Sequence, residues 1–386
     1  MRYLIHSAVS LFEKLTYDDA LKIKNANIGS MVHQYSLCNT ILTENDTVDF
    51  TNLLKLSNPI EFAHEVNEKY DCVVFSLGDF FRNDLLKNKK FANINLFLKN
   101  LKTKTLAIGI GCRRRYWQSV SEFINTDNMG NLIKEFISEN LKHSNIIGIR
   151  GYDTAHILNE LGFIENKDYI VCGCPSLFLH GDKLIIPEEI KPLNKDTKIA
   201  LNRNFNVNHI WPYSYVFYYD ILNKYINSNT IFTWFYEALN IHDETDKYGN
   251  GVIKLKNEDY NRLNYKYCFN IHDYFKLLSD YDICIGERLH GCAAAIAMGA
   301  PTIIICTDYR MEEVCNYHNI PYISIKNMIP NITIENIIPN INFNLMHKKH
   351  SINFEKYLSF FEQNNISTNF DTIKNNEETF FKILNK

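Results

Sequence analysis

Short apolar runs rich in β-branched residues recur along the chain, and each is followed by a stretch with helical spacing. Within the runs the hydrophobicity is continuous rather than alternating, which is typical of strands covered on both faces, as in a parallel sheet with helices on each side. The pattern therefore predicts an α/β protein, with strands at residues 3–6, 72–77, 105–110, 146–149, 169–171, 198–201, 230–233, 282–285 and 302–306.

The alternation of strands and helices is interrupted between residues 182 and 197, where two prolines and many charged residues accumulate. We therefore expect two domains, residues 1–182 and residues 197–340, joined by a linker at residues 183–196. Because each half holds several βα units, the chain is predicted to form two Rossmann-like, doubly wound sheets that face each other across a cleft.

The pattern changes again after Pro339. Two amphipathic stretches, residues 354–363 and residues 370–384, predict helices that pack on the outside of the protein. Residues 341–386 are therefore expected to form a C-terminal helical segment.

The composition limits the kind of partner. The 386 residues include 41 Lys and Arg against 44 Asp and Glu, a formal charge of −3. Such a balance offers no broad basic face, so nucleic acid is not expected as the main partner, whereas a local basic pocket for a small anion remains compatible with it.

The lengths of the apolar runs and the positions of the cysteines indicate where the protein is located and whether its thiols are reduced. No apolar run approaches the ~20 residues needed to cross a bilayer, and residues 1–14 lack the succession of regions typical of a signal peptide. We expect a cytoplasmic protein without a transmembrane segment, either free or peripheral at the inner face of the membrane.

The 10 cysteines mostly stand singly in apolar stretches, which predicts buried, reduced thiols.

The densest group of polar residues lies within residues 282–313. A predicted strand ends there, Glu287, Arg288 and His290 follow, and Gly291 is expected to open a helix of small residues. A guanidinium can bind a carboxylate or phosphate through two parallel hydrogen bonds, an imidazole can donate a proton near neutral pH, and a helix N-terminus adds positive potential. These residues therefore suit an anion. The alternative is that Arg288 pairs with Glu287 and His290 caps the helix.

The segment Gly286-Glu287-Arg288-Leu289-His290-Gly291 resembles the hallmark segment of the polysaccharide pyruvyl transferase family. Weaker likenesses to the family agree in order, over a span of residues 28–324. They are carried by Asn27-Ile28-Gly29, Ile149-Arg150-Gly151, Cys174-Pro175-Ser176 and Ala200-Leu201-Asn202-Arg203.

The resemblance implies two Rossmann-like domains similar to those of GT-B glycosyltransferases, with the acceptor side in the N-terminal domain and the donor side in the C-terminal one. It also implies transfer of pyruvate from phosphoenolpyruvate to a sugar as a ketal. Such chemistry needs an acid and cationic contacts. The resemblance implies His290 as the general acid, Arg288 on the donor carboxylate or phosphate, and Arg203 as a second cationic contact. No metal and no cofactor is required by this scheme.

The sequence also departs from the family pattern. Asn27 and Gly29 belong to a loop that usually continues with acidic residues, and Gly78 stands where the family has two consecutive glycines. The segment after the strand at residues 302–306 is unusually charged. There, Arg310 is a candidate anion ligand and Glu313 a candidate base for the acceptor hydroxyl. The alternative for these two residues is a surface pair on a helix.

Three arginines, Arg113 to Arg115, follow another buried strand and the glycines Gly109 and Gly111. Glycines allow a phosphate to approach the backbone closely, although the full glycine pattern of a dinucleotide site is not present, which disfavours a nicotinamide cofactor. Either Arg113 contacts a substrate diphosphate, or the arginines are merely solvated.

The leading hypothesis is a transferase of surface-polysaccharide biosynthesis, for a capsule or an exopolysaccharide. Its donor would be phosphoenolpyruvate, and its acceptor a sugar linked to a nucleotide or a lipid. The alternative keeps the fold and changes the donor: a GT-B-like glycosyltransferase in which Arg288 and His290 bind a nucleotide-sugar. A noncatalytic sugar-binding protein built on the same fold is a third hypothesis.

Overall fold

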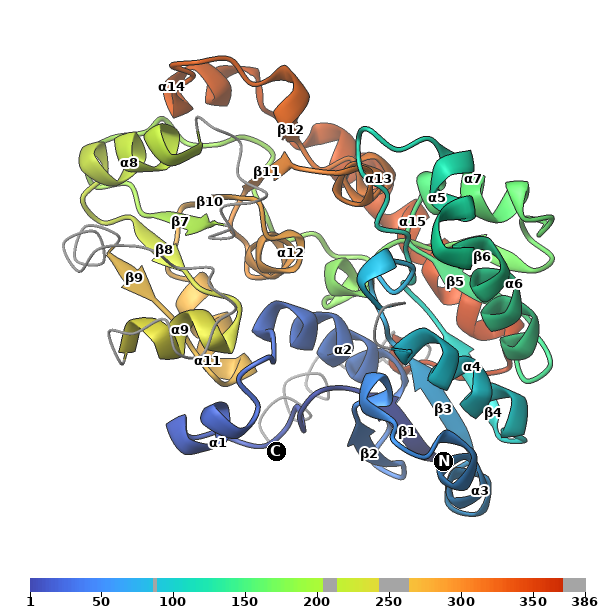
Figure 1. The fold of residues 1–386 in the computed structure, drawn as a ribbon. Coiled ribbons are helices and arrows are strands. Elements are labelled where there is room, and N and C mark those ends of the chain that lie inside the picture. Colours follow the sequence, from blue (N-terminus) through green and yellow to red (C-terminus); the bar gives the residue numbers. More distant parts are fainter. Residues whose placement is uncertain (86–88, 204–213, 243–263, 371–386) are drawn as a thin grey trace. The chain divides into compact units, whose positions relative to one another are not determined.

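The computed structural model describes residues 1–85, 89–203, 214–242 and 264–370. Its contacts divide the chain into two compact units (Figure 1). Unit 1 contains residues 1–7, residues 33–182 and the described part of residues 351–386, and unit 2 contains residues 8–32 and 183–350. Residues 8–32, which we expected in the N-terminal domain, therefore cluster with the second half of the chain.

Unit 1 is built on parallel strands. Strands β1 to β4 form one sheet in the order β2-β1-β3-β4, and β5 pairs with β6. A parallel bridge between Ile110 and Ile149 connects the chain beyond β4 to the end of β5. The strand order β2-β1-β3-β4 places a topological switch point between β1 and β3, and open α/β sheets bind ligands beyond the carboxyl ends of the strands at such points. The strands are β1 (Arg2–His6), β2 (Thr47–Thr51), β3 (Cys72–Phe75), β4 (Lys104–Ala107), β5 (Ile147–Ile149) and β6 (Tyr169–Val171).

The helices of unit 1 cover these strands with aromatic side chains. Phe75 of β3 packs against Phe97 of α4 and Phe136 of α6, with ring centroids 6.3 and 6.0 Å apart. A Cβ atom at Gly148 of β5 would lie only 3.1 Å from a ring carbon of Phe360 in α15, so α15 packs closely against this strand. The helices are α3 (Pro59–Lys69), α4 (Lys90–Asn100), α5 (Val120–Asn125), α6 (Met129–Asn140) and α7 (Tyr152–Glu160), together with α2 (Ile28–Ile41) and α15 (Asn344–Gln363), which both begin in unit 2.

Unit 2 contains a six-stranded parallel sheet in the order β12-β11-β10-β7-β8-β9. Numbered within the unit, this is the order 6-5-4-1-2-3 of a Rossmann fold, which places the switch point between β7 and β10. The strands are β7 (Ile199–Asn202), β8 (Asn229–Ile231), β9 (Tyr265–Lys266), β10 (Ile283–Gly286), β11 (Thr302–Cys306) and β12 (Tyr322–Ser324).

Helices cover both faces of this sheet. Alternate residues of β7, β10 and β11, such as Leu201 and Ile285, form an apolar core with α8 and α14. The intervening residues lie under α12, where a Cβ on Gly291 would lie only 2.4 Å from Oδ1 of Asn202. The helices are α1 (Tyr17–Lys22), α8 (Ser214–Lys224), α9 (Phe235–His242), α11 (Ile271–Leu278), α12 (Leu289–Ala297), α13 (Tyr309–His318) and α14 (Ile334–Ile337).

The α/β class and all nine predicted strands are confirmed. Three short strands, β2, β9 and β12, were not predicted. Helix α12 begins at Leu289 rather than at Gly291, and α15 begins at Asn344, ten residues before the predicted helix. The helix expected at residues 370–384 lies almost wholly outside the described residues. The GT-B-like pairing of the two units stays a prediction. All 10 cysteines are free thiols.

Candidate functional site

Four of the predicted site residues meet at the switch point of unit 2. Arg203 follows β7 directly, and Glu287 and Arg288 follow its neighbour β10. The two segments are joined by hydrogen bonds, because Nε of Arg288 donates to the carbonyl of Arg203 at 3.1 Å and the Glu287 amide donates to the carbonyl of Asn202 at 2.8 Å. His290 lies in the first turn of α12. The carboxyl ends of adjacent parallel strands thus bring both arginines and the imidazole to one edge of the sheet.

The segment that contains Asn27 and Gly29 reaches the same place. Asn27 forms an antiparallel bridge with Trp234, and the Ile28 amide donates to the carbonyl of Thr233 at 2.8 Å. Oδ1 of Asn27 accepts from the amide of Ser30 at 3.2 Å, so this side chain supports the first turn of α2.

Gly29 is required by close packing. A Cβ at this position would lie 3.0 Å from Cβ of His290 and 3.2 Å from the amide nitrogen of Gly291. Because backbone and Cβ atoms cannot move aside as the end of a long side chain can, any larger residue would push the first turn of α2 away from the first turn of α12. Gly29 therefore positions the turn that carries His290.

The partner of Arg288 is Glu237, a residue that the sequence did not single out. Nη2 of Arg288 forms an ion pair with Oε1 of Glu237, which is fully buried in the first turn of α9. The same carboxylate accepts from the Trp234 amide at 3.1 Å. Burial raises the pKa of Glu237, and the Arg288 guanidinium opposes that rise. The only signal in the sequence is an acidic residue in the first turn of a helix, which ordinarily indicates a cap.

Arg203 is held by aromatic side chains. Its guanidinium carbon lies 4.9 Å from the ring centre of Tyr218 and 6.0 Å from that of Tyr219. The hydroxyl of Tyr218 donates to Oε1 of Glu287 at 3.3 Å, and burial raises the pKa of Tyr218 well above its ordinary value, so it keeps its proton. Arg203 is only 5% exposed, which means that its position is fixed before any ligand binds.

The resulting site is charged but nearly balanced. Two guanidiniums, Arg203 and Arg288, face two carboxylates, Glu237 and Glu287, and the N-terminus of α12 adds a partial positive charge. An anion would therefore be bound by N–H groups held in fixed directions rather than by a large excess of positive charge. The proposed alternative pairing of Arg288 with Glu287 is wrong, because the carboxylate that pairs with Arg288 is that of Glu237.

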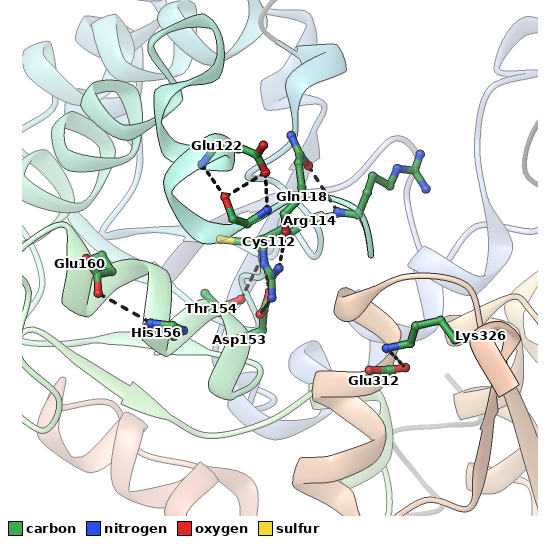
Figure 2. Close-up of polar contacts among 12 residues, drawn as sticks. Cys112, Arg114, Gln118, Glu122, Asp153, Thr154, His156, Glu160, Glu312 and Lys326 are labelled. Atoms are coloured by element: carbon green, nitrogen blue, oxygen red, sulfur yellow. Dashed lines mark hydrogen bonds and ion pairs between the residues drawn. The ribbon is translucent and has the colours of Figure 1, made fainter.

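Arg310 and Glu313 lie on α13, which follows β11, one strand further from the switch point. The guanidinium of Arg310 forms an ion pair with Asp308, the N-cap of the same helix, at 3.4 Å. Glu313 is only 3% exposed, so it is not part of a surface pair. On the same helix Glu312 pairs with Lys326 at 3.5 Å (Figure 2). The roles of Arg310 and Glu313 in binding and catalysis stay predictions.

The two remaining predicted residues, Gly78 and Arg113, lie together at the carboxyl edge of unit 1. The Gly111 amide donates to the carbonyl of Gly78 at 2.7 Å, and the Arg113 amide donates to that of Phe81 at 2.8 Å. Gly78 has a φ of 60°, which favours glycine. The loops after β3 and β4 are thereby joined. Their contact with a substrate stays a prediction.

The neighbouring Arg114 is not a solvated arginine. Its guanidinium forms an ion pair with Asp153 in the first turn of α7 and donates to the carbonyl of Gln118 (Figure 2). Both side chains of the ion pair are largely buried, with 10% and 12% exposed. Arg114 therefore holds the loop after β4 in place.

Within the described residues, no group of three or more His, Cys, Asp or Glu side chains is arranged to hold a metal ion. Among the helices of the same part of the chain, none combines the length and the apolar character needed to cross a bilayer.

Several solved structures resemble the chain weakly. HepE from Anabaena in complex with UDP-glucose shares 10% identity over 100% of this chain and 99% of its own, with a TM-score of 0.45. UDP-GlcNAc 2-epimerase from Neisseria meningitidis bound to UDP-GlcNAc shares 14% identity over 92% and 94%, with a TM-score of 0.42. MnaA from S. aureus with UDP shares 12% over 92% and 90%, with a TM-score of 0.40. These likenesses are too weak to support a conclusion about this chain.

A comparison with curated protein sequences gives no match. The model of the family described as polysaccharide pyruvyl transferase matches residues 6–309, which is most of the chain. The match includes every predicted site residue except Arg310 and Glu313. The chain therefore belongs to the polysaccharide pyruvyl transferase family and is a transferase.

Proposed function

We propose that this transferase moves pyruvate from phosphoenolpyruvate to a sugar, as a cyclic ketal, during the synthesis of a surface polysaccharide. The observation that supports this function is the meeting of Arg203, Arg288 and His290 at the switch point of unit 2. We expect the acceptor to be a sugar linked to a nucleotide or a lipid, and no metal or cofactor to take part.

The two arginines match the two anionic groups of the donor. Phosphoenolpyruvate carries a carboxylate and a phosphate, and guanidiniums bind both kinds of group through paired hydrogen bonds. Arg288 is fixed by Glu237 and by the carbonyl of Arg203, and Arg203 is fixed by Tyr218. Because both guanidiniums are fixed in advance, little conformational entropy would be lost when the donor binds.

His290 would act as the general acid. It donates a proton to the methylene carbon of phosphoenolpyruvate, which becomes a methyl group while C2 gains oxocarbenium character. A sugar hydroxyl attacks C2 and passes its proton to the imidazole of His290, which restores the general acid. A second hydroxyl of the same sugar then displaces phosphate from C2 to close the ring. The products are the ketal and inorganic phosphate, and the second hydroxyl proton leaves with the phosphate. Proton transfer by such a group contributes a rate factor of about 10² to 10⁴.

Release of inorganic phosphate tests the proposal. The protein is incubated with phosphoenolpyruvate and a panel of nucleotide-linked and lipid-linked sugars, and phosphate is measured with and without each sugar. We expect release only when an accepted sugar is present, together with a pyruvylated product detected by mass spectrometry. Release of a nucleotide from a nucleotide-sugar, with no response to phosphoenolpyruvate, would favour a glycosyltransferase instead.

A further inference from the structure

The loop after β4 in unit 1 presents an aromatic side chain that the donor site does not use. Trp117 is 77% exposed, although tryptophan contributes more apolar surface than any other side chain. Tyr152, the first residue of α7, is also exposed, at 54%. A single exposed aromatic residue is common on protein surfaces. Trp117 differs from such residues because the turn that contains it is held by several hydrogen bonds.

Trp117 lies in a tight turn that is fixed by hydrogen bonds. The Gln118 amide donates to the carbonyl of Arg115 at 3.0 Å, and Oε1 of Gln118 accepts from the Arg115 amide at 3.4 Å. Arg114, which precedes the turn, contacts the carbonyl of Gln118, which follows Trp117, and forms an ion pair with Asp153 in α7 (Figure 2). The exposed ring is therefore carried on a rigid support.

The beginning of the same loop is attached to its neighbours. The Cys112 amide donates to Oγ1 of Thr154 in α7 at 3.0 Å (Figure 2), and the Arg113 amide donates to the carbonyl of Phe81. After the turn, Ser119 and Glu122 form a capping box at the start of α5. Rigid aromatic side chains lose little entropy on binding, and they are frequent among the residues that dominate binding energy.

The position of the turn indicates the class of ligand. The loop leaves the carboxyl end of β4, and α7 begins directly after β5, so both lie at the edge where open α/β sheets bind ligands. Arg113 and Arg115 are half-buried in the same loop and supply guanidiniums, which suit phosphate groups. The flat face of an indole suits the apolar face of a sugar ring.

We propose that Trp117, Arg115 and Tyr152 form an acceptor surface in unit 1, which binds a sugar diphosphate. Trp117 stacks on the sugar ring, and Arg115 contacts the diphosphate. This assignment rests on the proposed function for the identity of the acceptor, but the surface can be tested without the transfer reaction.

Calorimetric titration of the full chain with UDP-glucose, UDP-galactose and UDP-N-acetylglucosamine tests the surface. We expect at least one of them to bind, and Trp117→Ala to weaken that binding about tenfold or more without lowering the melting temperature. Arg115→Gln should weaken it severalfold. Phe12→Ala, which removes an aromatic ring that is 53% exposed in unit 2, is the matched control and should change nothing.

Two further measurements separate the possible outcomes. Stabilisation by phosphoenolpyruvate should be equal in the wild type and Trp117→Ala; if phosphoenolpyruvate has no effect on either protein, the proposed donor is wrong while the acceptor surface stands. The acceptor surface is overturned if no UDP-sugar binds, or if Trp117→Ala binds UDP-sugars as tightly as the wild type does. It is also overturned if Trp117→Ala changes only binding to phosphatidylglycerol vesicles, which would make Trp117 a membrane contact.

Discussion

The two units use related sheet topologies but place different chemistry at their switch points. In unit 2 the position between β7 and β10 carries Arg203, Arg288 and two buried carboxylates. In unit 1 the position between β1 and β3 carries hydroxyl, amide and imidazole groups: Ser7 donates to Gln34 at 2.8 Å, and Oγ of Ser76 lies 2.6 Å from Nδ1 of His33. Of the two switch points, that of unit 2 therefore has the guanidiniums that could bind a small dianion directly after its strands.

Buried charge in these sheets is stabilised by nearby carboxylates and aromatic rings. Isolated charges are expensive to bury, and each of the three described arginines of unit 2, Arg203, Arg288 and Arg310, is accompanied by a carboxylate or an aromatic face. In unit 1 the side chains directly after β1 and β3, Ser7 and Ser76, are uncharged, and three guanidiniums lie further along the edge, in the loop after β4.

The largest expected effect concerns His290. If it is the acid in unit 2, His290→Ala should lower turnover by roughly 100-fold or more, because the methylene carbon loses its proton donor. The melting temperature should change little, since the side chain is half-buried and lies in the first turn of α12 rather than in the core. Phosphate release and thermal unfolding are the measurements. A large loss of stability with intact activity would make His290 structural.

Glu237→Gln should have the next largest effect. The variant keeps the size of the side chain but removes the charge that orients Arg288, so donor affinity should fall by roughly thirtyfold, about 2 kcal/mol. We expect the KM for phosphoenolpyruvate to rise more than kcat falls, and Glu237→Asp to restore part of the affinity. An unchanged KM in Glu237→Gln would show that Arg288 needs no orienting carboxylate.

Asp153→Asn tests unit 1 in the same way. It breaks the largely buried ion pair with Arg114 and should lower the free energy of unfolding by about 1.5 kcal/mol, measured in urea. Asp71→Asn, which breaks an exposed pair with Arg2, should change it by less than about 0.5 kcal/mol. Neither should alter stabilisation by phosphoenolpyruvate, and a loss of that stabilisation in Asp153→Asn would place the donor in unit 1.

The smallest effect is a pH dependence that arises at the end of β1. His6 is buried, and this burial lowers its pKa from the ordinary 6.5 to about 4. Because the unfolded chain binds a proton near pH 6.5 and the folded chain does not, stability falls as pH decreases from 6.5 toward 4. Between pH 6.5 and 5.5 the loss should be about 1 kcal/mol. His6→Gln should remove this part of the dependence, and equal slopes in both proteins would contradict it.

Much of the fold was predictable from local sequence. Nine strands were predicted because buried parallel strands are continuous apolar runs, whereas β2 is half-exposed and β9 has only two residues. Arg288 was predictable because it closely follows such a run, whereas Arg203 was predicted from the family resemblance.

The partners of those residues were not predictable. Glu237 lies 51 positions from Arg288, and only the order of β7, β8 and β10 in the sheet brings them together. Arg150 is another example. The resemblance to the family includes this residue, but it does not predict that Arg150 is completely buried or that its Nε donates to the carbonyl of Gly109. Long-range contacts of this kind depend on topology, which local patterns do not contain.

Calorimetric titration with phosphoenolpyruvate measures directly whether the switch point of unit 2 binds the donor. Wild type, Arg203→Ala in unit 2 and Arg113→Ala in unit 1 are compared under one set of conditions. We predict that Arg203→Ala weakens binding at least about tenfold, while Arg113→Ala binds as the wild type does. Equal affinity in Arg203→Ala and wild type, or a loss confined to Arg113→Ala, would contradict the account.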